Sequence, residues 1–400
     1  MLYGSAGIFI CFTRCRLAGL LLKGIHYFRE ILRMSEINKT ERLDYLDSAR
    51  GIAALMVMFG HLINWKYADK TVVQATSVLI NANDAVSFFF VLSGMVLSYP
   101  YLQLGKKLDI GKFYVARIFR IYPGFWVALL AGILYANRYA LNAANLVDVF
   151  IHNKQQFWEE FLLIRGHNVF YGAGWTLSYE LLYSFLMPFL VVIAKQNKKL
   201  VPWFIWTSVA MAYVTGIFLF HFALGLFIAA HFSTYNSEAI KATWWYRYRY
   251  PIIILALPMF SMRYWTKIFP IGGSTLHYTL DFLRLDFFYL SGLASFTFII
   301  CLIHYSKLRR IFQLPFLVYI GKISYGIYLV HWVLVCAMGD YWESRILPLF
   351  PGAVSALLVT AAVCFTLTII LASGLHYCIE IPFMKLGKKV IKKMKPTLEI

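Results

Sequence analysis

Long apolar stretches recur along this chain, and they constrain its fold more than any other feature of the sequence. Only 14% of the residues are charged, against about 25% in a typical soluble protein. A stretch of about 20 apolar residues is long enough to cross a membrane as a helix. We therefore predict an all-α polytopic membrane protein with about ten transmembrane helices. The expected spans are residues 48–65, 85–104, 115–136, 174–194, 201–217, 218–232, 251–266, 284–303, 316–338 and 353–377.

The basic residues are distributed unevenly over the loops between these spans. Of the 38 lysines and arginines, 28 fall on one side of a ten-span chain and nine on the other, while Lys322 lies inside a span. Cytoplasmic loops carry an excess of Lys and Arg, so the richer side is expected to be cytoplasmic, with both termini. The net charge of +19 would suggest a nucleic-acid partner in a soluble chain. Here topology explains it, and we expect no nucleic-acid partner.

The chain divides into three expected parts: a cytoplasmic N-terminal segment at residues 1–47, a transmembrane domain at 48–382 and a basic cytoplasmic tail at 383–400. Residues 5–22 are apolar but are interrupted by Arg14 and Arg16. A signal peptide instead carries its charge before the apolar core. Residues 1–33 are therefore interpreted as an amphipathic surface segment or as an extension upstream of a start at Met34. The six cysteines follow no disulfide or metal-ligand spacing, and no metal is expected.

The first expected span carries two ionisable residues eleven positions apart, Arg50 and His61. Eleven residues of an α-helix return to within about 20° of the same face and rise about 16 Å. One helix face would therefore hold a cation near its cytoplasmic end and an imidazole near its outer end. Ionisable groups in a bilayer are costly and usually mark a functional path. The alternative is an interfacial arginine and a structural histidine.

Five local patterns follow one another along the chain. They are Arg50-x10-His61, preceded by Leu43-Asp44-Tyr45-Leu46-Asp47; Phe88-Phe89-Phe90-Val91-Leu92-Ser93-Gly94; Arg117-x-x-Arg120-x-x-Pro123; Trp175-Thr176-Leu177-Ser178-Tyr179-Glu180; and Gly321-Lys322-Ile323-Ser324-Tyr325-Gly326-Ile327-Tyr328-Leu329-Val330-His331, with Glu380-Ile381-Pro382 closing the last span. In this order they resemble the acyltransferase-3 family of membrane O-acyltransferases, best known for acetylating bacterial surface polysaccharides. Two positions depart from the family pattern: Thr176 replaces the usual Ser, and Ser87 stands where many members have Asp, for which Asp84 is a possible substitute.

The resemblance implies a catalytic site built on His61, Arg50 and Glu180. His61 matches the presumed catalytic histidine, and an imidazole that titrates near neutral pH can take the proton of an acceptor hydroxyl. Arg50 matches its cationic partner, which would either order the site or contact the acyl donor. Glu180 would orient an imidazole or accept a sugar hydroxyl. Its alternative is a structural hydrogen bond to another span.

Arg117 and Arg120 are neighbours on a helix, so both guanidinium groups can reach one ligand. The planar guanidinium suits phosphate because it donates two parallel hydrogen bonds. The resemblance implies acetyl-CoA as the donor, with its phosphates at these two residues. The alternative is that they anchor the topology. Their expected place is the cytoplasmic start of the third span, whereas Glu180 and His331 are expected toward the outside.

The remaining candidates would line the path of the acceptor or belong to the core: Trp175, Ser178, Tyr325, Tyr328 and His331. The last three fall on one helix face at spacings of three residues. Ser93 is a further path candidate, although Ser93-Gly94 is more simply explained by close helix packing.

The resemblance thus implies an O-acyltransferase of the bacterial inner membrane. It would move an acetyl group from acetyl-CoA to a hydroxyl of a glycan or lipid-linked glycan, such as O-antigen or capsule, surrounded by membrane lipid. The rival from another class is a transporter or flippase of a glycan, which inverted repeats would favour, and none is visible. A third option is acylation of a small molecule. The sequence does not indicate an oligomeric state.

Overall fold

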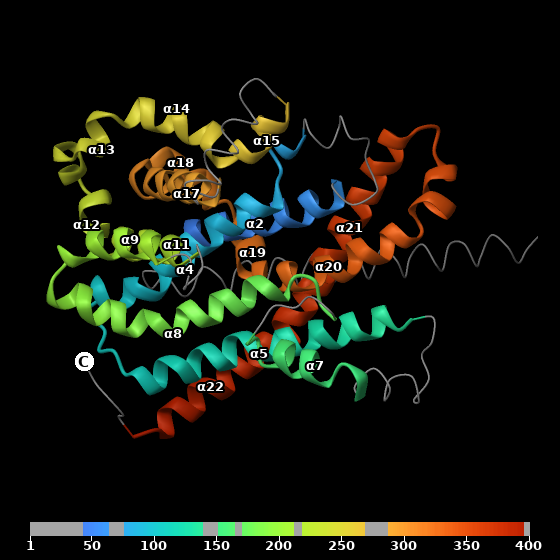
Figure 1. Cartoon of the computed structure of the whole chain (residues 1–400), viewed down its shortest axis with the longest axis horizontal. Helices are drawn as coiled ribbons and strands as arrows, with labels where there is room; N and C mark the ends of the chain where they lie inside the picture. The colour runs from blue at the N-terminus through green and yellow to red at the C-terminus, as the bar shows by residue number, and fades with distance from the viewer. Residues whose placement is uncertain are drawn as a thin grey trace, which may run out of the picture. The chain divides into compact units, whose positions relative to one another are not determined.

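The computed structural model describes residues 43–63, 76–138, 151–164, 170–211, 218–268 and 287–395. The regular elements in these ranges are helices, and no β-strand occurs among them (Figure 1). The described residues from Tyr45 onward belong to one compact unit. The expected extension at residues 1–33 lies outside the described residues.

The helices differ widely in length. In chain order they are α2 (Asp44–Leu62), α4 (Ala82–Leu102), α5 (Ile110–Ala136), α7 (Lys154–Phe161), α8 (Gly174–Gln196), α9 (Leu200–Ala210), α11 (Phe218–Ala230), α12 (Phe232–Tyr235), α13 (Trp244–Arg247), α14 (Arg249–Phe260), α15 (Met262–Ile268), α17 (Phe287–His304), α18 (Ser306–Phe312), α19 (Pro315–Lys322), α20 (Ser324–Asp340), α21 (Ala353–Leu375) and α22 (Ile381–Lys393). Short 3-10 turns occupy Glu238–Ala242 and Leu347–Leu349, and π-helical turns occupy Trp342–Ile346 and His376–Glu380.

Four helical stretches in the described part are long and apolar enough to cross a membrane: α4, α5, α8 and the continuous Ala353–Lys393. The number rises to six if α17 with α18, bent by 98°, and α19 with α20, bent by 69°, each count as one span. The apolar helices α9, α11 and α14 have only 10–17 residues. The protein is therefore all-helical and membrane-integral in character, while ten spans and cytoplasmic termini stay predictions.

Helix α2 has 19 residues but does not meet the apolar criterion for a span. Asp47, Arg50 and His61 lower its hydropathy, although more than half of its residues are buried in the protein. A helix with this composition is stabilised by protein neighbours rather than by lipid. Because of these polar residues, hydropathy alone does not identify α2 as a membrane span.

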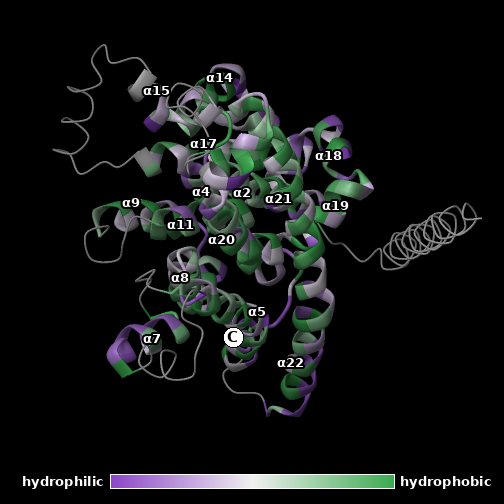
Figure 2. Cartoon of the chain, turned by 90° about the vertical axis from the view of Figure 1, so that its right-hand side faces the viewer, coloured by the Kyte–Doolittle hydropathy of each residue, from purple (hydrophilic) through white to green (hydrophobic). Residues whose placement is uncertain are grey.

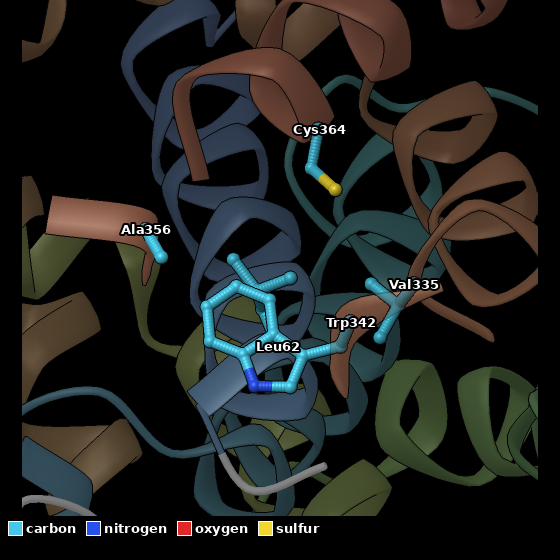
Figure 3. Packing of buried hydrophobic residues seen from close by; sticks show 5 residues of the cluster. All are labelled: Leu62, Val335, Trp342, Ala356 and Cys364. Carbon is cyan, nitrogen blue, oxygen red and sulfur yellow. The ribbon is translucent and has the colours of Figure 1, made fainter. Parts of the chain in front are cut away.

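Glycines bring α2 close to two other parts of the chain. A Cβ on Gly51 would lie 2.7 Å from the amide nitrogen of Gly321 in α19, and one on Gly60 would lie 2.7 Å from that of Ala82 in α4. Both separations are shorter than real Cβ contacts, so these backbones meet only because the side chains are absent. The end of α2 is held further by a buried apolar cluster shared with α20, the π-helical turn after it and α21 (Figure 3), made of Leu62, Val335, Trp342, Ala356 and Cys364.

Helices α4 and α11 also pack through glycines. A Cβ on Gly94 would collide with the carbonyl oxygen of Phe222, and one on Gly225 would collide with the carbonyl oxygen of Val91. Close packing at Gly94, which the sequence predicted, is therefore confirmed. Small residues at a helix interface allow this approach in membrane proteins.

The described residues between α5 and α8 lie alongside α5. Tyr122 donates to the carbonyl oxygen of Leu162 at 2.8 Å, and the indole of Trp126 donates to that of Phe161 at 3.1 Å. Farther along α5, a Cβ on Gly132 would reach the backbone of Phe170. The described part of residues 137–173, expected as an external loop, thus packs beside the middle of a long apolar helix. Helix α8, which follows these residues, therefore begins beside the middle of α5.

Candidate functional site

Arginines gather around the first half of α2. The charge of Arg50 interacts with four others, those of Asp47, Arg120, Glu180 and Arg117. A terminal nitrogen of Arg50 lies 3.2 Å from the carboxylate of Asp47, one turn earlier on the same helix. The structure therefore brings Arg50 within electrostatic range of both arginines of the third motif. We call these three residues, with Asp47, Glu180 and Glu380, the arginine group.

Two further ion pairs hold the arginines of α5. Arg117 Nη2 donates to Glu180 Oε1 of α8 at 2.8 Å, and Arg120 Nη1 donates to Glu380 Oε2 at 2.7 Å. In each case the described hydrogen bond to a carboxylate uses one terminal nitrogen of the guanidinium. The five N–H donors of an arginine form a fixed fork, so a group held at one corner keeps others for a ligand.

The position of Glu180 differs from the one expected. The sequence placed it near the outer end of its span, far from Arg117 at the cytoplasmic start of another. The two side chains are in direct contact. The expectation was wrong because α8 begins beside the middle of α5, where residues 170–174 have returned along that helix. Glu180 is only six residues into α8 and so lies deep beside Arg117.

The sequence predicted no site role for Glu380, which only marked the end of the last span. In the structure it is a buried member of the arginine group. It is 1% exposed and closes the π-helical turn His376–Glu380 between α21 and α22. Its Oε2 atom also lies 3.0 Å from His376 Nδ1. Turns of this type often occur at functional sites. The motif Glu380-Ile381-Pro382 was the available signal, but its partner is 260 positions away.

Two histidines meet at the other end of α2. The rings of His61 and His331 stack with centroids 5.3 Å apart. Each Nδ1 atom contacts a backbone carbonyl oxygen: that of Val57 at 2.9 Å for His61, and that of Tyr328 at 2.6 Å for His331. A carbonyl only accepts hydrogen bonds, so Nδ1 of each neutral ring carries the hydrogen and Nε2 carries the lone pair. Both histidines thus present a proton acceptor.

One face of α20 connects the arginine group with the histidine pair. The guanidinium of Arg120 lies over the ring of Tyr325 at 5.4 Å. One turn later Tyr328 donates to the carbonyl oxygen of Ala173 at 3.0 Å and contacts the hydroxyl of Thr176. The next turn carries His331. The three aligned residues of α20 thus contact three different helices. Tyr325 contacts α5, Tyr328 contacts α8, and His331 contacts α2.

The other path candidates have contacts elsewhere. The ring of Trp175 packs against Tyr179 and against Phe218 of α11. The hydroxyl of Ser178 lies 3.5 Å from the carbonyl oxygen of Gly174. Ser93 is half-buried on α4 beside Gly94. The described contacts of these side chains do not join them to either end of α2.

The family's variable carboxylate position lies on α4. Ser87, which stands where many members have Asp, accepts a hydrogen bond from Ser291 at 2.7 Å. Asp84 is 2% exposed in the first turn of α4, where its amide donates to the Asn81 side chain at 2.8 Å. Asp84 is thus a buried carboxylate one turn before Ser87. Its position is compatible with Asp84 substituting for the Asp that many members carry at position 87.

Residues 170–174 form a wall beside the histidine pair that the sequence did not reveal. The buried carboxylate of Glu160 accepts from the amides of Phe170 and Tyr171 at 3.2 Å. Tyr171 then donates to the carbonyl oxygen of Leu329 at 2.6 Å. Gly172 leaves room for the indole of Trp332, whose edge meets the ring of His61 at 5.3 Å. Because Glu160 lies in a polar stretch expected as a loop, no local pattern marked it.

Carboxylates in this site pair with arginines, a histidine and backbone amides. Within the ranges that the structure describes, no three His, Cys, Asp or Glu side chains form a group that could hold a metal ion.

Comparisons with known proteins agree with the motifs. A family model for acyltransferase domains of the acyltransferase-3 type matches residues 43–371. Nodulation protein 10 of Rhizobium leguminosarum bv. viciae is 25% identical over 355 residues, which is 78% of this chain and 89% of that protein. Protein 2 in picA locus of Rhizobium radiobacter is 39% identical over 94 residues, or 22% of this chain and 43% of that protein. No solved structure matches. The matched residues include α2 with both of its polar ends, and the chain belongs to the acyltransferase-3 family of membrane acyltransferases.

Proposed function

We propose that this membrane acyltransferase moves an acetyl group from acetyl-CoA to a hydroxyl of a cell-surface glycan or its lipid-linked precursor, in the bacterial inner membrane. The observation that carries the proposal is the separation of two chemically different groups along one helix. Guanidinium groups suited to phosphate surround the start of α2, and a pair of proton-accepting imidazoles lies at its end. Arg50 and His61 are eleven residues apart, which corresponds to about 16 Å along the axis.

This separation suits coenzyme A. About thirteen bonds separate the phosphate oxygen of its pantetheine arm from the thioester carbon, and each advances an extended chain by about 1.2 Å, giving a reach of about 16 Å. A donor whose phosphates lie in the arginine group would therefore present its thioester near His61. The face of α20 with Tyr325 and Tyr328 runs between the two ends and would lie along the arm.

The chemistry then needs a base and a phosphate clamp. Arg117 and Arg120 would donate their remaining N–H groups to the donor's phosphates. His61 Nε2 would take the proton of the acceptor hydroxyl while its oxygen attacks the thioester carbon. The carbon–sulfur bond breaks, and the proton passes to the departing thiolate as the imidazole returns to its neutral form. The packing of Trp332 and His331 against His61 would keep the ring oriented.

The test is acetyl transfer by the purified protein in liposomes that contain a lipid-linked glycan from the source bacterium. Radiolabelled acetyl-CoA is supplied on the side of the arginine group, and the glycan is analysed for incorporated label. We expect labelling with the wild type and at least about 100-fold slower labelling with His61→Gln. Asp340→Asn is the matched control, because its ion pair with Arg138 joins α5 and α20 at their other ends. Movement of the glycan across the bilayer without acetylation would instead support a flippase.

A further inference from the structure

The helix α22 has three distinct faces. At 100° per residue, Met384, Gly387 and Ile391 lie within a sector of about 60°. This sector packs on α5: Met384 Sδ lies 3.6 Å from a terminal nitrogen of Arg120, and a Cβ on Gly387 would lie 2.7 Å from that of Phe119. Figure 1 shows α22 running alongside α5. One face of α22 is thus already occupied by protein.

The second face is apolar and exposed. Phe383, Leu386 and Val390 are 38%, 47% and 37% exposed and also fall within about 60° of one another. An exposed apolar stripe at this spacing is typical of a helix that rests in a membrane surface.

The third face is basic. Five lysines occupy a sector of about 140°, all of them exposed, and the helix contains no acidic residue. Figure 2 shows hydrophilic positions gathering toward the end of α22. The lysines are Lys385, Lys388, Lys389, Lys392 and Lys393.

The length of the helix that contains α22 indicates where its faces lie relative to a bilayer. The helical stretch Ala353–Lys393 has 41 residues and would measure about 60 Å, whereas the hydrocarbon core of a bilayer is about 30 Å thick. If α21 crosses the core, α22 extends beyond it into the headgroup layer. There an apolar stripe next to a basic face matches the boundary between acyl chains and headgroups.

We propose that α22 is a lipid-binding helix: its lysines bind the headgroups of anionic phospholipids, while Phe383, Leu386 and Val390 insert among the acyl chains. Charge selects this occupant. Five cations without a counter-ion on the helix attract anionic headgroups, whereas zwitterionic lipids offer no net charge. This surface is separate from the donor contacts of Arg117 and Arg120, and it does not depend on the identity of the acyl donor.

The first experiment locates the two exposed faces. Single cysteines replace Leu386 or Lys389 in a cysteine-free full-length chain, and each is labelled with a nitroxide in liposomes containing phosphatidylglycerol. We expect position 386 to collide with oxygen dissolved in the acyl chains and position 389 with a water-soluble nickel complex. Equal access of both positions to the nickel complex would overturn the proposal. So would a disulfide between two copies at position 386, because the stripe would then face a second chain.

The second experiment measures lipid preference by electron paramagnetic resonance of spin-labelled phosphatidylglycerol and phosphatidylcholine bound to the full-length protein. We expect the wild type to prefer phosphatidylglycerol by about fivefold, the ratio that about 1 kcal/mol represents. Changing the five lysines of α22 to Gln should reduce the preference to below twofold. A control variant loses the same charge elsewhere and should keep it: Lys195, Lys198, Lys199, Lys307 and Arg310 changed to Gln.

A preference that survives in the α22 variant and disappears in the control would assign the lipid contacts to other loops and refute the proposal. The proposal is also refuted if changing the five α22 lysines to Gln leaves the lipid preference unchanged and alters only the affinity for acetyl-CoA. The lysines would then attract the soluble donor rather than lipid.

Discussion

Removing Arg120 is expected to disturb both stability and donor binding, because the residue holds a buried carboxylate as well as facing the expected donor. The Glu380 side chain is 0% exposed and that of Arg120 is 28% exposed. Deleting one partner of a buried ion pair typically costs about 3–5 kcal/mol. We expect Arg120→Ala near the lower limit, because His376 Nδ1 remains 3.0 Å from the same carboxylate oxygen. A loss of donor binding in this variant would therefore be ambiguous by itself.

A second substitution separates the two effects. In Arg120→Ala/Glu380→Gln no charge is left uncompensated in the pocket, so thermal stability should return toward that of the wild type. The phosphate contact is still missing. Loss of one charge-assisted hydrogen bond costs about 1.5–3 kcal/mol, which weakens binding about 10- to 150-fold. The double variant should therefore be stable but bind acetyl-CoA poorly.

The assay is isothermal titration calorimetry of acetyl-CoA in detergent micelles, with the unfolding temperature measured on the same samples. The control Arg138→Ala/Asp340→Asn removes an ion pair that lies at 2.6 Å between the other ends of α5 and α20. It should leave donor affinity unchanged. Wild-type affinity in the stable Arg120→Ala/Glu380→Gln protein would refute the reasoning and leave Arg120 with a structural role.

Three further outcomes are expected. His61→Gln should bind acetyl-CoA normally but transfer acetyl at least about 100-fold more slowly, and the wild-type rate should fall at acidic pH as the imidazole becomes protonated; a His61→Gln rate within threefold of wild type would leave His61 as a packing residue. Gly225→Ala should destabilise the protein by more than about 1 kcal/mol, since its Cβ would meet the backbone of α4, whereas Gly374→Ala, with open space around it, should not. A cysteine at position 198 should react with an impermeant thiol reagent only from the cytoplasmic side, and labelling from outside spheroplasts would contradict the topology.

Local patterns in the sequence predicted several features well. The shared helix face of Arg50 and His61 follows from helical periodicity, and the close approach at Gly94 follows from a small residue in an apolar span. The sequence also assigned His61 and His331 to the same side of the membrane, and their rings are in contact; that this side is the outer one stays a prediction. Each of these inferences depends on residues within one helix, or on the direction in which a helix crosses the membrane.

Contacts between distant segments could not be predicted in the same way. Arg117 and Glu180 are 63 positions apart, and Arg120 and Glu380 are 260 apart. Hydropathy gives the length of an apolar segment but not its depth relative to another. The depth of α8 depends on the returning chain before it, which the carboxylate of Glu160 holds through backbone amides. These bonds leave no periodic pattern.

The arginine group is electrically balanced, because each of its three guanidinium groups pairs with one carboxylate. An anionic donor can use the remaining N–H groups, and it would bind more tightly if one carboxylate released its guanidinium. Glu380 is fully buried and held by His376, whereas the side chain of Glu180 is 27% exposed, and its described ionic contact is with Arg117. Glu180 is consequently the group that can give way, leaving Arg117 to the phosphates.

Glu180→Gln should then strengthen acetyl-CoA binding, because an amide competes for the guanidinium less well than a carboxylate. A charge-assisted hydrogen bond contributes about 0.5–1.5 kcal/mol more than a neutral one, so the dissociation constant should fall by about two- to tenfold. Turnover at saturating acetyl-CoA should change little in the same variant, because Glu180 pairs with Arg117 in the arginine group rather than with the histidine pair. Calorimetry and acetyl transfer on one preparation test both, with Asp340→Asn as the matched control. Weaker donor binding in Glu180→Gln would instead make Glu180 the residue that positions Arg117 for the phosphates.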